Sequence, residues 1–125
     1  MAKGNKLGKF GEDAACDYLI SHGYTVRETN WRLGHLEIDI VAQEPDSDCL
    51  HIIEVKTRSN DEDFDPMEAI TPAKIRCLVN AANGYISHYE LRMSVQFDVM
   101  IIVGTPEDYD IRFYPDAFDP PLSTR

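Results

Sequence analysis

Charged side chains stand at alternate positions inside two segments that are otherwise apolar. The segments are "LEIDIVAQ" at 36–43 and "CLHIIEVKTRS" at 49–59. The charged residues are Glu37 and Asp39 in the first, and Glu54 and Lys56 in the second. Side chains of a β-strand alternate between its two faces, so the two charged residues of each segment are predicted to share one face. Adjacent antiparallel strands lie about 4.8 Å apart, so a suitable register would bring the two charged faces together.

Such a cluster would hold two or three carboxylates and one ammonium group. Crowded carboxylates have raised pKa values and destabilise the fold unless a cation neutralises them. Mg²⁺ prefers oxygen ligands, and it can orient a water molecule for attack on a phosphodiester. Lys56 beside that ion could hold the attacking water or stabilise the charge that develops on phosphorus. The pattern therefore favours a site for metal-assisted phosphodiester hydrolysis.

A simpler interpretation stays open for each of these charges. Charged residues alternate with apolar ones on any strand that has one face in water, and Glu-x-Lys is common on such strands. Glu12 is equally ambiguous. It falls at the border of an apolar helical stripe, where it could face the sheet or act as a first-turn acid that complements the helix dipole.

The predicted elements that would position these residues form a mixed α/β sheet with helices packed against it. Apolar spacing predicts helices, alternation or continuous apolar runs predict strands, and Thr71-Pro72 is a typical helix start. Three successive strands indicate an antiparallel meander, and a strand after the second helix indicates a parallel pairing. The predicted order is helix 8–22, strands 24–33, 36–43 and 49–59, helix 71–91, strand 94–104, and a short strand 109–114.

Length and composition predict one domain over residues 1–125, with flexible ends at 1–7 and 119–125. No apolar stretch is long enough for a membrane helix and no secretion signal is visible, so we expect a cytoplasmic protein that does not contact membranes. The cysteines are odd in number and widely spaced, which favours buried thiols over a disulfide framework or a zinc site. They are Cys16, Cys49 and Cys77.

The net charge of −10 and the pI near 4.6 argue against a broad basic surface for nucleic acid. Much of the acid is concentrated in "NDEDFD" at 60–65 and "PEDYD" at 106–110, which are predicted to be solvated loops. The overall charge can therefore coexist with a locally basic site.

Five blocks of the sequence, taken in order, resemble the UPF0102 (YraN) family of bacterial proteins. The blocks are "GKFGEDAACDYLISHGY", "NWRLGHLEIDIVA", "IIEVKTRS", "PMEAITPAKIRCLVNAANGYI" and "QFDVMII". This resemblance covers roughly residues 8–103, and the ordered combination is more specific than any single block. It implies a restriction-endonuclease-like fold related to Holliday-junction resolvases, with the same helix-strand-strand-strand-helix-strand order.

The resemblance also implies roles for individual residues. Asp39 and Glu54 would be the metal-binding acids of a PD-(D/E)xK motif, Lys56 its lysine, and the Val55 carbonyl a further Mg²⁺ or Mn²⁺ ligand. Glu12 would be the catalytic acid that resolvase-like members add from the first helix, and Glu37 would lie at the rim. The candidates for phosphate contacts are Arg32, Arg58 and Lys74.

Three positions depart from the family pattern. Ile38 stands where the motif has proline, Leu36 stands where glycine is common, and Gln96 stands where arginine is usual. The last change removes either a phosphate contact or a salt bridge.

Two hypotheses about function follow. The first is a metal-dependent nuclease that acts on DNA, including branched DNA, and that forms a homodimer as related resolvases do. The second is a non-catalytic nucleic-acid-binding or adaptor protein that retains the nuclease fold. A third possibility is that the acidic surface binds a protein partner, and that the nuclease works only when this partner supplies positive charge.

Overall fold

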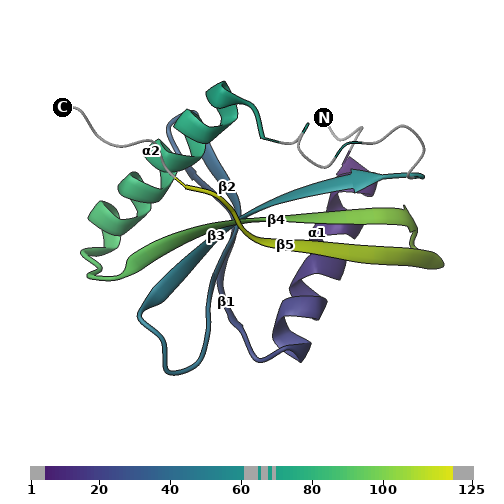
Figure 1. Cartoon of the computed structure of the whole chain (residues 1–125), viewed down its shortest axis with the longest axis horizontal. Helices are drawn as coiled ribbons and strands as arrows, with labels where there is room; N and C mark the ends of the chain where they lie inside the picture. Colours follow the sequence, from purple (N-terminus) through teal and green to yellow (C-terminus); the bar gives the residue numbers. More distant parts are fainter. Residues whose placement is uncertain (1–4, 61–64, 66–67, 69, 120–125) are drawn as a thin grey trace.

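The computed structural model describes residues 5–60, 65, 68 and 70–119. Two helices cover opposite faces of one five-stranded sheet (Figure 1). The elements are α1 (Asn5–Ser21), β1 (Thr25–Leu33), β2 (Leu36–Gln43), β3 (Cys49–Arg58), α2 (Pro72–Tyr89), β4 (Ser94–Thr105) and β5 (Asp108–Phe118). The predicted order and the predicted mixed α/β class are both confirmed.

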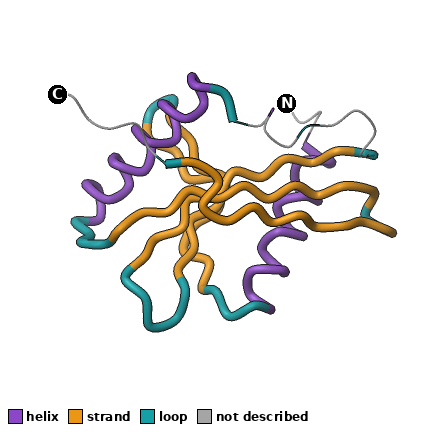
Figure 2. Tube along the Cα trace, in the orientation of Figure 1, coloured by secondary structure: helices purple, strands orange, loops and turns teal. Residues whose placement is uncertain are grey.

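The strands follow the order β1-β2-β3-β4-β5 across the sheet (Figure 2). β1 with β2, β2 with β3, and β4 with β5 are antiparallel, as the short connections between them require. β3 and β4 are parallel, because α2 carries the chain back along the sheet between them. The predicted meander and the predicted parallel pairing are therefore both present.

The sheet has a separate apolar core on each face. Successive residues of β3 show the division, since Ile52 packs with α2 whereas Ile53 packs with α1. The α2 core includes Leu78 and the fully buried Tyr85, and the α1 core includes Leu19. β3 and β4 carry apolar residues on both faces because both faces are covered, and the buried polar residues among them are His51, Glu54 and Asp98.

Local signals set the limits of α2. Thr71 is the N-cap, and its hydroxyl accepts a hydrogen bond from the Lys74 backbone N–H at 3.1 Å. Pro72 follows as the first helical residue, where its missing N–H costs nothing. Glu90 ends the helix in a left-handed conformation, with φ of 56°. The first turn of α2 is therefore held firmly in place, and Lys74 belongs to it.

Several predicted details differ in the structure. α1 begins at Asn5 rather than at residue 8, and β5 extends to Phe118, which stacks on Phe97 with ring centroids 4.9 Å apart. Cys77 is exposed on α2, and Cys16 and Cys49 are only half-buried, so the expectation of three buried thiols is wrong. Of the ends predicted to be flexible, residues 1–4 and 120–125 lie outside the described residues.

The two predicted acidic loops also have different outcomes. Asp108–Asp110 open β5 and are exposed, so that stretch is solvated but is partly strand. Within the other stretch, residues 61–64 lie outside the described residues. In the described chain, neither helix is long and apolar enough to cross a membrane.

Candidate active site

The predicted site lies where the sheet divides. The pairing of β2 with β3 joins residues 40–43 to residues 50–53. Beyond that point the start of β2 pairs with β1, and the end of β3 pairs with β4. Figure 1 shows the resulting twist, with β1 and β2 running across the direction of β4 and β5. We call this point the fork, and Asp39 and Glu54 are the first residue of each strand past the β2–β3 pairing.

At the fork, the Asp39 side chain accepts a backbone hydrogen bond from β3 that a neighbouring strand would otherwise accept. Its Oδ2 accepts a hydrogen bond from the Val55 backbone N–H at 2.9 Å. The N–H and C=O of one strand residue point toward the same side, so the Val55 carbonyl is directed to the side where Asp39 lies. Burial raises the pKa of the Asp39 carboxyl, while the hydrogen bond from Val55 lowers it by a smaller amount.

Glu54 is the most buried acid of the site, with a side chain 4% exposed. Its Oε2 lies 3.6 Å from Lys56 Nζ and 3.3 Å from Lys74 Nζ. Burial and then the nearby charge of Asp39 raise the pKa of Glu54 to about 6, and the two lysines only partly offset this. A carboxyl with this pKa marks a place where negative charge is concentrated and incompletely neutralised.

One predicted feature of β2 is wrong. Regular alternation, which the sequence predicts for Glu37 and Asp39, would also place Ile38 and Ile40 together on the opposite face. Instead, Ile38 packs in the α2 core and Ile40 in the α1 core. The change of face falls at Asp39, opposite Asn30 of β1, whose φ of 51° interrupts the regular strand. Asp39 is therefore directed along the sheet toward β3, which explains its bond to the Val55 backbone.

Glu12 reaches the fork from α1. It lies about two turns into the helix, so the first-turn interpretation is wrong. Its Oε1 accepts a hydrogen bond from Asn30 Nδ2 at 2.8 Å. Burial raises the pKa of Glu12, the bond from Asn30 lowers it, and the charges of Asp39 and Glu37 raise it further.

An open cleft of about 370 Å³ lies beside Glu12. It is lined by Gly8, Lys9, Glu12, Asn30, Arg32 and Glu37. Arg32 and Glu37 face each other across β1 and β2, with Arg32 Nη2 3.5 Å from Glu37 Oε1. Glu37 is far more exposed than Glu54, with a side chain 41% exposed, as its predicted rim position would require.

The structure thus brings Asp39, Glu54, Lys56 and Lys74 together, with Glu12 on the neighbouring cleft. Arg58 lies at the end of β3, where its Nη1 donates to the Thr57 carbonyl at 3.2 Å. The direct contact of Lys74 with Glu54 was not predicted, because it joins residues 20 positions apart in sequence from different elements. Asn30 was also missed, although an asparagine inside a strand pattern is a known signal of irregular backbone.

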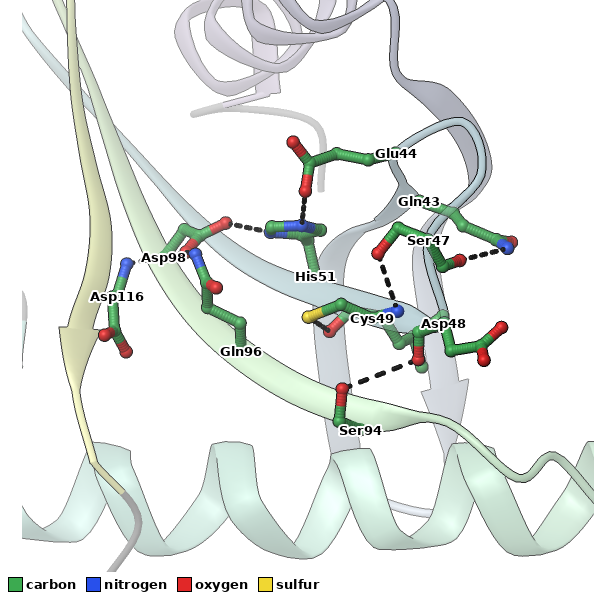
Figure 3. A network of polar contacts seen from close by, with 11 residues as sticks. Gln43, Glu44, Ser47, Asp48, Cys49, His51, Ser94, Gln96, Asp98 and Asp116 are labelled. Atoms are coloured by element: carbon green, nitrogen blue, oxygen red, sulfur yellow. Dashed lines mark hydrogen bonds and ion pairs between the residues drawn. The ribbon is translucent and has the colours of Figure 1, made fainter.

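A second buried polar network lies away from the fork, near the other end of β3 (Figure 3). His51 Nδ1 lies 2.8 Å from Asp98 Oδ2, and its Nε2 lies 3.2 Å from Glu44 Oε1. Asp98 also accepts bonds from Gln96 Nε2 at 3.0 Å and from the Asp116 backbone N–H at 2.8 Å. Burial alone would lower the pKa of His51, but its bonds to the two acids outweigh burial and raise it.

Gln96 belongs to this network. Its side chain bonds to Asp98, a buried acid, so a cation at position 96 would lie beside Asp98. In this chain, the Gln96 side chain is therefore part of an internal polar network. In this chain, His51 is the titratable cation that contacts Asp98.

The fold and site define an α/β protein in which two neighbouring strands and two helices direct acids and lysines to one point. The model of the family described as "Uncharacterised protein family UPF0102" matches residues 11–102, and the chain belongs to that family. A UPF0102 protein of Bacteroides fragilis is 47% identical over 122 residues, covering 98% of this chain and 99% of the relative. One from Flavobacterium psychrophilum is 41% identical over 118 residues, covering 94% and 98%.

Among solved structures, the chain is similar to Hjc, a Holliday junction resolvase from Archaeoglobus fulgidus. The two share 19% sequence identity with a TM-score of 0.49. The match covers 86% of this chain and 75% of that one.

Proposed function

We propose that this protein is a metal-dependent nuclease that hydrolyses phosphodiester bonds of DNA. The observation that carries the proposal is the pair of acids at the fork, the half-buried Asp39 and the buried Glu54, with Lys56 beside them. The order of the elements agrees with the restriction-endonuclease-like fold that the sequence resemblance implies. In that resemblance, Asp39 and the Glu54-Val55-Lys56 segment would match the PD-(D/E)xK motif.

The donor chemistry fits a hard divalent cation. Two carboxylates and the Val55 carbonyl offer oxygen ligands, and Mg²⁺ often uses only one or two protein carboxylates and completes its shell with water. The described residues include no cluster of three acids, histidines or cysteines placed to hold a metal. A Mg²⁺ ion or a Mn²⁺ ion at Asp39 and Glu54 would offset charge on the phosphate and lower the pKa of a bound water.

The protein's own residues would then divide the work. Asp39 and Glu54 would hold the ion, and the bond from Val55 keeps the Asp39 carboxylate in place. Lys56 holds the attacking water or stabilises the charge on phosphorus. Glu12, on the cleft beside the fork, would accept or hold a proton of that water, with Asn30 fixing its orientation.

The test is cleavage of linear duplex, single-stranded and four-way DNA, each with Mg²⁺, with Mn²⁺ and with EDTA. We expect metal-dependent cleavage that falls at least 100-fold in Glu54→Ala and in Lys56→Ala. Glu107→Ala is the matched control, since it removes an exposed acid of the β4–β5 turn and should leave the rate unchanged. Cleavage that survives both site substitutions would refute the assignment.

Separate measurements test the preference for branched DNA, the homodimer and the phosphate contacts. Faster cleavage of four-way DNA than of linear duplex would identify branched DNA as the substrate. Light scattering on the purified protein would show whether it is a homodimer. Arg32 and Arg58 are proposed to contact phosphates, so substituting either with glutamine should weaken DNA binding and flatten its salt dependence.

A non-catalytic role is the second candidate, and a specific observation favours it. The chain carries a net charge of −10, and Arg32, Lys56 and Lys74 are all within 4 Å of an acid. Such a surface attracts DNA weakly. Calorimetry separates the two roles, because an adaptor that only retains the fold would bind neither Mg²⁺ nor Mn²⁺ at millimolar concentration.

A further inference from the structure

Two ammonium groups compete for one oxygen of Glu54. Lys56 Nζ and Lys74 Nζ both lie near Oε2, and the contact from Lys74, at 3.3 Å, is the shorter. In the metal-free protein, the two lysines partly offset the negative charges of Asp39 and Glu54. Lys74 therefore holds a position that a divalent cation would contest, because such an ion adds two positive charges beside the same carboxylate.

The two lysines differ in their freedom to leave Glu54. Lys56 lies two residues along the same strand on the same face, so its backbone is always within about 7 Å of that of Glu54. Lys74 belongs to another element and reaches Glu54 by its side chain alone, which is 39% exposed. Its backbone is fixed by the bond to Thr71, so the side chain can move without a change in the helix.

The place of Lys74 in α2 also requires a negatively charged partner. A cation in the first turn of a helix is unfavourable, because the N-terminal end of the helix dipole is positive. Glu54 meets that requirement in the metal-free state. A phosphate group would meet it equally well, since first-turn N–H groups and a lysine both favour oxyanions.

We propose that Lys74 is the counterion that metal displaces. A divalent cation at Asp39 and Glu54 drives the Lys74 ammonium off Glu54 Oε2, and the released ammonium binds a DNA phosphate. Metal binding and DNA binding are thereby coupled, and the metal-free protein keeps its affinity for DNA low. This inference rests on the proposed function, because it requires the metal site at the fork.

The first measurement is Mn²⁺ calorimetry without DNA. Lys74→Gln should bind Mn²⁺ about three- to tenfold more tightly than the wild type, because one competing cation is gone. Arg76→Gln is the matched control, since it removes the same charge from an exposed position on the same helix. It should change the Mn²⁺ affinity by less than about twofold. Equal affinities of the two variants would overturn the inference.

The second measurement is the salt dependence of binding to a labelled duplex in Ca²⁺ and in EDTA, with gel analysis to show that the duplex stays intact. In the wild type, Ca²⁺ should steepen the slope of log K against log salt by about 0.9, the value for one added phosphate contact. Arg76→Gln should show the same change on adding Ca²⁺, and Lys74→Gln should show none. A full change in Lys74→Gln would contradict the proposal.

The variant Glu54→Gln separates a failure of the proposed metal site from a failure of the Lys74 displacement. If Glu54→Gln abolishes Mn²⁺ binding while Lys74→Gln behaves like Arg76→Gln, the metal site stands and the displacement is wrong. If Glu54→Gln binds Mn²⁺ as tightly as the wild type, or the wild type binds none, the proposed site is wrong and the displacement falls with it. Thermal melts of each variant confirm that it is folded.

Discussion

Glu54 combines the deepest burial of the site with a charge that its surroundings only partly neutralise. Two lysines contact it, yet its pKa still rises to about 6 because burial and Asp39 outweigh them. A shift from the ordinary 4.5 to about 6 means that the ionised carboxylate destabilises the metal-free fold by about 2 kcal/mol at neutral pH. The residue with the most direct part in the proposed chemistry is thus a liability for stability.

The destabilising charge of Glu54 can be tested by measuring the free energy of unfolding. Glu54→Gln should raise the free energy of unfolding of the metal-free protein by about 1–2 kcal/mol at pH 7.5, measured by urea denaturation in EDTA. The amide keeps the shape of the side chain and removes the buried charge. Glu37→Gln, at an exposed acid on β2, should change it by less than about 0.5 kcal/mol. A less stable Glu54→Gln would mean that the lysines compensate the charge fully.

At the scale of elements, the contact of α1 with β3 depends on a glycine. Gly11 is buried, and a Cβ on it would overlap the Thr57 hydroxyl oxygen. Gly8, one turn earlier, is exposed, and a Cβ there would meet nothing. The close approach of α1 at Gly11 helps to place Glu12, the next residue, beside the fork.

Two alanine substitutions test this packing. Gly8→Ala should stabilise the protein by about 0.5–1 kcal/mol through helix propensity. Gly11→Ala gains the same propensity but must push α1 away from β3, so it should destabilise by about 1–3 kcal/mol. Thermal melts of the two variants give the comparison, and equal shifts in Tm would show that α1 has room to move.

The sequence predicted the elements well, because their signals are local. Apolar periodicity located α2, the Thr71-Pro72 pair marked its start, and alternating charges pointed to Asp39 and Glu54. The structure was needed where distant segments meet. The approach of Lys74 to Glu54 depends on how α2 packs on the sheet, and the change of face at Asp39 depends on β1 through Asn30.

At the scale of the whole molecule, the His51 network joins parts of the chain that are far apart. It connects β3, β4, the segment after β2 through Glu44, and β5 through the Asp116 backbone. The charged groups facing His51 are Asp98 and Glu44, and the ring of Tyr24 packs edge-on against it at 5.3 Å. Both acids favour the protonated imidazole, so its pKa is higher in the folded protein than in the unfolded chain.

The raised pKa of His51 makes the free energy of unfolding depend on pH. A histidine with a raised folded pKa contributes stability that is fully present below its unfolded pKa, about 6.5, and is lost as pH rises through the folded value. We therefore expect the free energy of unfolding to fall as pH rises above about 6.5. Urea denaturation across pH 6 to 9 measures it. His51→Gln should reduce this dependence and leave the part that comes from Glu54, whose pKa is about 6, whereas His88→Gln, at an exposed residue of α2, should keep all of it.

The hydrogen bond from the Val55 backbone to Asp39 gives the protein a built-in spectroscopic reporter. An amide proton that donates to a carboxylate changes its chemical shift when that carboxylate gains or loses a charge partner. The Val55 resonance in a proton–nitrogen correlation spectrum should therefore move as metal is added. The occupancy of the fork could then be followed in the native chain without a label, a substrate or a substitution.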